Sequence, residues 1–449
     1  MPSERLIPLG FLLLIAVGTL LLWLPFSTAP GENTDFLTAL FTSTTSTCVT
    51  GLVVVDTFSH WSLFGQFVIL LLIQFGGLGI IAVTSSVFLI LKKKFSLRER
   101  LLIRDAFNLS TGSGLVRFLL RVIRGVFIAE AAGTVLYLPA FIPRFGVPEG
   151  IWVSLFTAVS AFCNAGLDII GPNSLMDFQK DPLVLIVTMM LIIAGGIGYV
   201  VWFDLSSSIS DGFRKKRPFR QFFVRLSEHT KLALVVTLIL IAVGAVGVFF
   251  MEYGNSGTIG GLSFGEKVLN SVFQSVTFRT AGFSTIPQER LTAGTGILGV
   301  VLMFIGGSPV GTAGGIKTVT IAVLFLNVLS FILGRRETTV FRRTVPETII
   351  RKATAIVSVS LAVTLVFSVL LSVTEGIPAL DALFEATSAT ATVGLSRAVT
   401  QDLTVPGRVI VILCMFFGRI GPISMALFFS AGSSDKGRIR HADGNFFVG

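Results

Sequence analysis

The stretch Phe41-TSTTSTCVT-Gly51, a short run of apolar and hydroxyl side chains ending in glycine, occurs in four related versions along the chain. The other three are Phe156-TAVSAFCNA-Gly166, Val272-FQSVTFRTA-Gly282 and Phe384-EATSATATV-Gly394. A second glycine motif, inside an apolar run, follows these glycines by 25, 29, 24 and 24 residues. These second motifs are Gly76-Gly-Leu-Gly79, Gly195-Gly-Ile-Gly198, Gly306-Gly-Ser-Pro309 and Gly418-Arg-Ile-Gly421. Recurrence at a near-constant spacing indicates an internal repeat, so we expect one structural unit used four times around an axis.

The composition indicates a membrane protein. Of the 449 residues, 52% are hydrophobic and only 13% are charged, with a mean hydropathy of +0.85. Soluble domains carry about 25% charged residues. A run of about 20 apolar residues can span a bilayer, and eight such runs predict two spans per repeat. They are Leu6–Phe26, Phe64–Leu91, Val122–Ile142, Leu183–Phe203, Leu232–Met251, Gly296–Leu333, Ala355–Val373 and Val409–Phe429.

The positive charge is unevenly distributed. Segments 92–124, 214–231 and 335–352 hold nine, seven and six Lys or Arg residues, whereas the connections that carry the glycine-ended stretches hold between none and three. The positive-inside rule places both termini and the basic segments in the cytoplasm, and the glycine-ended stretches outside. The net charge of +10 therefore reflects membrane topology, and we expect no nucleic-acid partner.

Each repeat is predicted to comprise an outer helix, a short external half-helix, an extended stretch and an inner helix. The predicted units are 1–100, 115–215, 225–340 and 350–430, followed by a cytoplasmic tail, 431–449. Two spans per unit return the chain to the same side, so all four units share one orientation, unlike inverted-repeat transporters. We expect an all-α polytopic fold with the four units around a pseudo-fourfold central pore.

The glycine-ended stretches are predicted to be pore loops. Ser263-Phe-Gly-Glu266 is a capping-box pattern for the third half-helix, and Asn33 is a candidate cap for the first. Each predicted half-helix is too short to span, and non-helical backbone at membrane depth is tolerated only inside protein or beside water. The alternative is four ordinary external loops with incidental glycines, which would not account for their shared spacing and composition.

Backbone carbonyls are the predicted ion ligands. Rings of carbonyls replace the hydration shell of a monovalent cation, and glycine allows the backbone to adopt φ > 0 without steric cost. The half-helix C-termini would direct their negative dipole ends toward the ion. Carboxylates are nearly absent from these stretches, which favours a monovalent cation. The predicted filter residues are Thr47, Cys48, Val49, Thr50, Gly51, Phe162, Cys163, Asn164, Ala165, Gly166, Phe278, Arg279, Thr280, Ala281, Gly282, Thr390, Ala391, Thr392, Val393 and Gly394.

Four ordered motifs resemble the pore loops of the Trk/Ktr/HKT potassium transporter superfamily. They are Cys48-Val-Thr-Gly-Leu52, Phe162-Cys-Asn-Ala-Gly166, Arg279-Thr-Ala-Gly-Phe283 and Ala391-Thr-Val-Gly-Leu395. The resemblance covers essentially the whole chain and implies potassium at the carbonyls next to Gly51, Gly166, Gly282 and Gly394. Serine in place of the first glycine goes with sodium transport in this superfamily, so Gly51 implies potassium. Eight spans favour the KtrB-type membrane subunits over the TrkH type, which has two more helices.

The third inner helix is predicted to break. Gly306-Gly-Ser-Pro-Val-Gly-Thr-Ala-Gly-Gly315 contains five glycines and a proline, and each is unfavourable in a helix. The resemblance implies an intramembrane gating loop; the alternative is a kinked helix without a gating role. Gly314-Gly-Ile-Lys-Thr318 is similar to a phosphate-binding loop, but an extra residue separates glycine from lysine, so we expect no nucleotide there. The predicted gate residues are Gly306, Gly307, Ser308, Pro309, Val310, Gly311, Thr312, Ala313, Gly314, Gly315, Lys317 and Arg419.

Two arginines lie within the predicted pore region. Arg419 replaces a glycine of the fourth inner-helix motif, and an intramembrane charge needs a partner. We expect it below the filter, bonded to carbonyls of 306–315 as an electrostatic barrier; the alternative is a structural salt bridge. Arg279 is predicted to point behind the filter and hold the loop by hydrogen bonds.

The resemblance also implies an assembly. It implies a homodimer in the bacterial cell membrane, a cytosolic nucleotide-binding regulatory ring of the KtrA type, and activation by sodium, with no organic cofactor on this chain. The tail His441-Ala-Asp-Gly-Asn-Phe-Phe-Val-Gly449 is predicted to lie at the dimer interface; a frayed terminus is the alternative.

Two other functional classes fit the sequence less well. A coupled secondary transporter for another cation or solute would need ionisable residues around an asymmetric midplane site. An enzyme would need a catalytic constellation, and no carboxylate, histidine or cysteine cluster of suitable spacing occurs.

Overall fold

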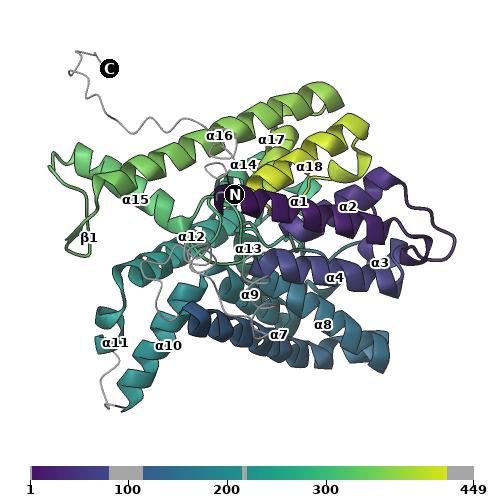
Figure 1. Cartoon of the computed structure of the whole chain (residues 1–449), viewed down its shortest axis with the longest axis horizontal. Coiled ribbons are helices and arrows are strands. Elements are labelled where there is room, and N and C mark those ends of the chain that lie inside the picture. Colours follow the sequence, from purple (N-terminus) through teal and green to yellow (C-terminus); the bar gives the residue numbers. More distant parts are fainter. Residues whose placement is uncertain (1–2, 80–114, 215–219, 422–449) are drawn as a thin grey trace.

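The computed structural model describes residues 3–79, 115–214 and 220–421, and this part of the chain is predominantly helical (Figure 1). Its first two groups of helices are α1 (Ser3–Leu22), α2 (Phe36–Cys48), α3 (Thr57–His60), α4 (Leu63–Leu78), α7 (Leu115–Phe145), α8 (Val147–Cys163), α9 (Pro182–Gly196), α10 (Tyr199–Arg214) and α11 (Arg220–Arg225). The remaining ones are α12 (Glu228–Glu252), α13 (Phe264–Thr277), α14 (Ala293–Phe304), α15 (Thr318–Ile332), α16 (Glu347–Glu375), α17 (Ala379–Thr390) and α18 (Val405–Ile420). Between α15 and α16, β1 (Thr339–Val340) pairs with β2 (Arg343–Thr344) in an antiparallel hairpin.

One order of elements recurs four times in the described residues. An outer helix packs against a shorter helix, an extended segment follows, and an inner helix comes next. The outer and short helices in contact are α1 with α2, α7 with α8, α12 with α13, and α16 with α17. In Figure 1, α16 lies along the upper edge of the view and α7 with α8 along the lower edge, with α9 and α13 between them.

The contacts between successive groups form a closed cycle. Each inner helix packs against the short helix of the next group: α4 against α8, α9 against α13, and α14 against α17. The last inner helix, α18, packs against the first short helix, α2. The four short helices therefore surround a common centre.

Polar caps fix where the helices begin. The predicted capping box of α13 is present, with Ser263 and Glu266 bonding each other's backbone. The hydroxyls of Ser62 and Thr292 accept from the backbone of the first turns of α4 and α14. Asn33 does not cap α2, whose N-cap is Asp35, without a side-chain cap bond. The helix begins two residues later than Asn33 would allow.

Three described helices are long and apolar enough to cross a bilayer: Phe118–Phe145 within α7, α12 and α16. Pro182–Gly196 and Tyr199–Asp211, in α9 and α10, would together be a fourth, bent by 100°. Shorter apolar helices occupy most of the other predicted spans. They are Ile7–Leu22, Leu63–Leu78, Ala293–Phe304 and Thr318–Ile332, whereas a fifth, Val147–Cys163, is the short helix of the second group and lies in no predicted span. The predicted spans Phe64–Leu91 and Val409–Phe429 continue into residues outside the described ones, where the predicted tail interface also lies.

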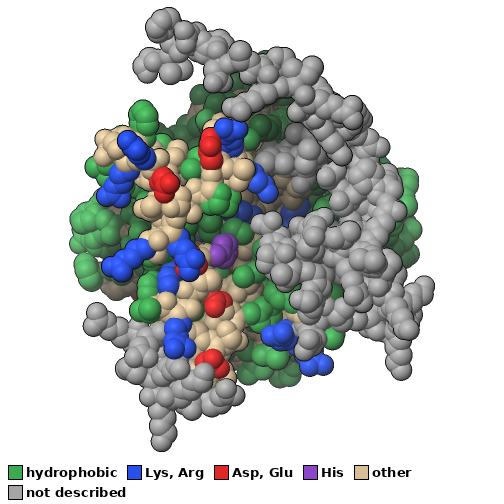
Figure 2. Space-filling view, turned by 60° about the vertical axis from the view of Figure 1, so that its left-hand side comes forward, with side chains coloured by type: hydrophobic (Ala, Val, Ile, Leu, Met, Phe, Trp, Pro, Cys, Tyr) green, Lys and Arg blue, Asp and Glu red, His purple; other side chains and the backbone are tan. Residues whose placement is uncertain are grey.

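The outer surface and the centre differ in polarity. Large apolar side chains cover the outer helices, for example Val373 of α16 and Phe250 of α12 at 77% and 74% exposure, as suits contact with lipid. The hydroxyl-rich short helix α2 is instead buried. Figure 2 shows Lys and Arg gathered on the face that carries the hairpin. Exposed basic residues there are Arg335, Arg336, Arg342, Arg343, Arg351 and Lys352.

Candidate functional site

The four predicted filter glycines meet at the centre of the helix cycle. A Cβ atom built on Gly51 would lie 2.4 Å from the carbonyl oxygen of Ala165 and 3.2 Å from Cα of Gly394. One built on Gly166 would lie 2.6 Å from Cα of Gly282, and one on Gly282 would lie 2.7 Å from the oxygen of Val393. Each segment thus contacts its neighbours in the order of the chain, and the fourth returns to the first. Backbone fills the space that side chains would need.

The same backbone conformation occurs in all four segments. Each glycine has a positive φ, of 99°, 66°, 83° and 96° along the chain. Two residues before each glycine, a non-glycine residue is also left-handed. These residues are Val49, Asn164, Thr280 and Thr392, with φ of 56°, 60°, 65° and 51°. Such a conformation costs about 1–3 kcal/mol for a non-glycine residue and persists where surrounding structure imposes it, often at functional sites.

These left-handed residues were not anticipated from the sequence. Only Asn164 carries a signal, because asparagine tolerates this conformation better than most residues, whereas it is a genuine outlier for a β-branched residue such as Val49. A second missed feature is a hydroxyl six residues before the glycine. Thr45 accepts from the N–H of Gly51 at 3.0 Å, and Ser388 accepts from that of Gly394 at 3.1 Å.

An open cavity of about 230 Å³ lies against one side of the glycines, all four of which line it. Its charged lining residues are Asp56, Asp168 and Glu289, and no Lys or Arg lines it in the described part of the chain. Asp168 is buried and accepts from the backbone N–H of Ile170 at 3.3 Å. Burial raises the pKa of this carboxyl to about 6.

The inner-helix glycines contact the backbone of the predicted filter segments, by which we mean residues 47–51, 162–166, 278–282 and 390–394. A Cβ atom on Gly76 would lie 2.0 Å from the oxygen of Thr47, and one on Gly195 would lie 1.8 Å from that of Phe162. Gly418 has the same relation to Thr390, at 2.1 Å. In the third group, Gly306 instead meets the oxygen of Gly314, at 2.0 Å. In the third group, therefore, a loop that contains Gly314 takes the place beside the inner-helix glycine that a filter segment takes in the other three groups.

The third inner helix is interrupted where its glycines predict a break. The helix α14 ends at Phe304 and α15 begins at Thr318. We call the residues between, 305–317, the central loop. It is closed by hydrogen bonds from the N–H of Gly306 to the oxygen of Ile316, 3.0 Å, and from the N–H of Thr318 to that of Gly307, also 3.0 Å.

The central loop bonds to the second inner helix and to two filter segments. The N–H of Thr312 donates to Gly195 at 3.1 Å. Its hydroxyl lies 3.1 Å from the oxygen of Phe162 and 2.8 Å from Oδ1 of Asn164. The N–H of Gly314 donates to the hydroxyl of Thr280 at 3.2 Å. Residues 312–314 thus lie directly beside the filter segments.

The basic residues also bond to the central loop. As predicted, Arg419 donates to a loop carbonyl, that of Thr312, at 2.8 Å. It also donates to the oxygen of Gly76 in the first inner helix. Lys317 donates to Ala313 at 2.6 Å. These bonds place two cationic side chains at the loop.

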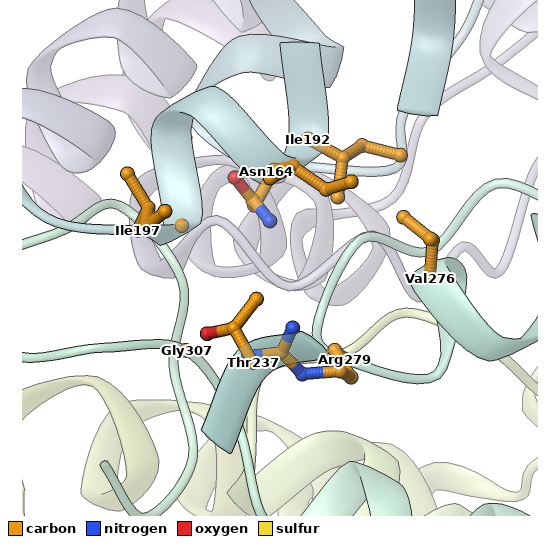
Figure 3. A pocket seen from close by; sticks show the side chains of 9 residues that line it. Asn164, Ile192, Ile197, Thr237, Val276, Arg279 and Gly307 are labelled. Atoms are coloured by element: carbon orange, nitrogen blue, oxygen red, sulfur yellow. The ribbon is translucent and has the colours of Figure 1, made fainter. Parts of the chain in front are cut away.

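Arg279, predicted to hold the loop by hydrogen bonds, donates to the oxygen of Gly306 at 3.3 Å. Figure 3 shows it beside Asn164 and Thr237 around a small cavity, together with Gly307. The Nε of Arg279, the Nδ2 of Asn164 and the hydroxyl of Thr237 are buried without a protein partner. The cavity is also lined by residues of α9 and α13, so it lies among the second and third predicted filter segments, α9, α12, α13 and the central loop.

The two cysteines of the predicted filter, Cys48 and Cys163, are fully buried. Cys163 is buried beside Glu130, which accepts from Gln74 at 3.3 Å. Asp204 accepts from the N–H of Ser227 at 2.9 Å, near the start of α12. Cys48 is buried and forms no disulfide.

Comparison with known proteins shows what the chain resembles. It matches the family described as "TrkH: Cation transport protein" over residues 10–437. It is 39% identical to the Ktr system potassium uptake protein B of Bacillus subtilis over 445 residues, which is 99% of this chain and 96% of that protein. It is 38% identical to the potassium/sodium uptake protein NtpJ of Enterococcus hirae, covering 93% and 90% of the two chains.

The fold also resembles a solved transporter. The crystal structure of the potassium transporter TrkH from Vibrio parahaemolyticus aligns with a TM-score of 0.75, at 17% identity, over 95% of this chain and 84% of that one. The relatives are transport proteins and not enzymes. The chain is a multi-pass membrane protein that belongs to the Trk/Ktr family of potassium uptake transporters.

Proposed function

We propose that this chain conducts potassium into the cell through a pseudo-fourfold central pore, whose filter is the ring of glycine segments and whose gate is the central loop. The meeting of Gly51, Gly166, Gly282 and Gly394 carries the proposal. Four segments with one backbone conformation, in a closed ring, can present equivalent carbonyls to one axial ion. Eight spans, two for each repeat, would surround it.

The filter would work without side-chain chemistry. Potassium sheds water when carbonyl oxygens replace its hydration shell. The paired left-handed residues of each segment give the backbone the turns needed to bring its carbonyls toward the axis. The helices α2, α8, α13 and α17 have their C-termini at the four filter segments, where the helix dipoles add negative potential. On the open side, the carboxylates of the 230 Å³ cavity would concentrate cations at the mouth.

The central loop would block the pore below the filter. Its contacts with two filter segments and the second inner helix support this position. The positive charges of Arg419 and Lys317 at the loop would raise the barrier to a cation. Opening would require Arg419 to release Thr312, and the ion would then pass down its electrochemical gradient.

The wider assembly is proposed from family membership. We propose a homodimer in the bacterial cell membrane with both termini in the cytoplasm. A KtrA-type nucleotide-binding ring would control the gate, and sodium would activate uptake. The relative named for potassium and sodium uptake supports a role for sodium. The basic face in Figure 2 supports a cytoplasmic hairpin.

Potassium uptake by a potassium-deficient bacterial strain tests the filter. Gly51→Ser and Gly282→Ser place a side chain against neighbouring backbone, so both should alter the preference for potassium over sodium. Gly31→Ser is the matched control, because Gly31 has a φ of 91° but no atom within 4 Å of its built Cβ. Unaltered ion preference in both filter variants would show that these glycines do not form the filter.

A further inference from the structure

The second filter segment lacks the side-chain hydroxyl bond that the other three receive from their own short helix. In the first and fourth segments, Thr45 and Ser388 bind the glycine N–H from behind. In the third, the hydroxyl of Thr277 donates to the oxygen of Phe283 at 2.6 Å. In the second, Ser160 holds the position equivalent to Thr45, yet its buried hydroxyl has no hydrogen-bond partner. The second segment keeps its backbone bonds to α8, from the N–H of Asn164 to Ala161 and from the N–H of Ala165 to Ser160, but it has no such hydroxyl bond.

The central loop supplies hydroxyl bonds instead, through one side chain. The hydroxyl of Thr312 reaches two acceptors of the second segment, the oxygen of Phe162 at 3.1 Å and Oδ1 of Asn164 at 2.8 Å. Thr312 and Asn164 are both about 1% exposed, so water does not compete for these bonds. Asn164 is also the left-handed residue of this segment.

Thr312 is itself fixed on both sides along the backbone. Its N–H donates to Gly195, and its oxygen accepts from Arg419. Because its backbone is held in this way, Thr312 keeps its position if the second filter segment moves. The position of that segment therefore depends on the position of the central loop. Ser308 is a contrasting loop hydroxyl, since it bonds to Thr318 at 3.0 Å and to no filter residue.

We propose that Thr312 is a positioning residue for ion selection: the loop that closes the pore also holds the second filter segment in shape. This inference rests on the proposed filter and gate. Selectivity among monovalent cations depends on the number and field strength of carbonyls and on how far they can move. Loss of the Thr312 bonds frees the carbonyl of Phe162 and leaves the Asn164 amide unsatisfied, so the segment can close around the smaller sodium ion.

The test compares two loop hydroxyls in the full-length protein. Uptake of rubidium, as a potassium tracer, and of sodium is measured in proteoliposomes for Thr312→Val, Thr312→Ser and Ser308→Ala. The rubidium-to-sodium ratio should fall about five- to tenfold in Thr312→Val, the change expected from one lost buried hydrogen bond. Thr312→Ser should retain the ratio, because the hydroxyl remains. Ser308→Ala should change flux only.

The outcomes separate this inference from the proposed gate. If Thr312→Val raises flux with an unchanged ratio, the gate stands and the positioning role is wrong. If the ratio falls equally in Ser308→Ala, a general loosening of the loop is responsible and the role of Thr312 is also wrong.

A second measurement tests the proposal if Thr312→Val is purified in too low a yield for transport assays. The melting temperature of purified Thr312→Ala and Thr312→Ser is compared in potassium and in sodium. We expect the extra stabilisation by potassium to shrink in Thr312→Ala and to persist in Thr312→Ser. Full retention in Thr312→Ala would overturn the proposal.

Discussion

The glycine segments and the inner helices of this protein have diverged to different degrees. All four segments share a left-handed glycine and a left-handed residue two positions earlier. The inner helices share only their first glycine. Three of those glycines contact a filter-segment carbonyl, while Gly306 contacts the central loop. Under the proposed function, this difference means that selection of an ion at the centre uses all four segments alike, whereas a single altered inner helix controls passage.

Shortening the central loop should produce the largest effect on this comparison. Deletion of several residues between Gly307 and Gly314 removes Thr312 and its bonds to Gly195, Phe162 and Arg419. We expect potassium uptake to rise about tenfold, because the obstructing loop and its hydrogen bonds are lost; this rise corresponds to a barrier lower by ~1.4 kcal/mol. Uptake should also depend less on a cytosolic partner. Initial uptake rates in the deficient strain measure it. Equal or lower flux in a well-folded deletion would argue against a gate.

Two adjacent glycines of α9 sharpen the comparison at intermediate magnitude. Gly195→Ala forces a methyl against the oxygen of Phe162, 1.8 Å away, whereas Gly196→Ala makes ordinary contacts with the Cβ of Ala313 at 3.4 Å and the Nδ2 of Asn164 at 3.6 Å. Both changes gain similar helix propensity. Only Gly195→Ala should therefore lower stability, by about 1–3 kcal/mol as for an overpacked core, and reduce uptake.

Thermal unfolding in detergent together with uptake measures this difference. Gly195→Ser extends the series with a larger side chain and should be at least as disruptive. Equal melting temperatures for Gly195→Ala and Gly196→Ala would mean that close approach of the helix to the filter segment is not required.

Asp168 lines the open cavity beside the second filter segment, and its removal should have the smallest effect on potassium uptake. Its pKa is raised to about 6 by burial, so the carboxyl is charged at neutral pH and becomes protonated as external pH falls through 6. Uptake should then fall by about a factor of two, because the mouth loses one of its negative charges. Asp168→Asn should have lower uptake at neutral pH and lack this acid-sensitive component. An unchanged pH profile in Asp168→Asn would exclude Asp168 as its source.

The sequence predicted those features that glycine alone determines. The meeting of Gly51, Gly166, Gly282 and Gly394 and the break at 306–315 follow from periodicity and helix propensity, because glycine both adopts positive φ without steric cost and is unfavourable inside a helix. Arg419 could be placed at the loop because a membrane-buried charge must find carbonyls. Family resemblance then gave the ion, which spacing alone did not.

The remaining features depend on tertiary contacts that no local pattern encodes. Val49 in a left-handed conformation is imposed by its surroundings against its own preference. Ser160 and Ser388 occupy equivalent positions, yet only Ser388 binds its glycine, so the sequence does not distinguish them. Asn33 and Asp35 are both plausible caps, and the turn before α2 decides between them.

The closed cycle of helix contacts also constrains how the protein is made. The helix α2 is synthesised among the first, but its neighbour in the cycle, α18, is among the last. Until α18 inserts, the hydroxyl-rich face of α2 and the segment ending at Gly51 have no partner on one side. Contacts between such distant parts of a chain form late. The cycle of helices therefore cannot close before residues 405–420 have been synthesised and inserted, and a chain truncated before residue 405 would leave α2 without this neighbour.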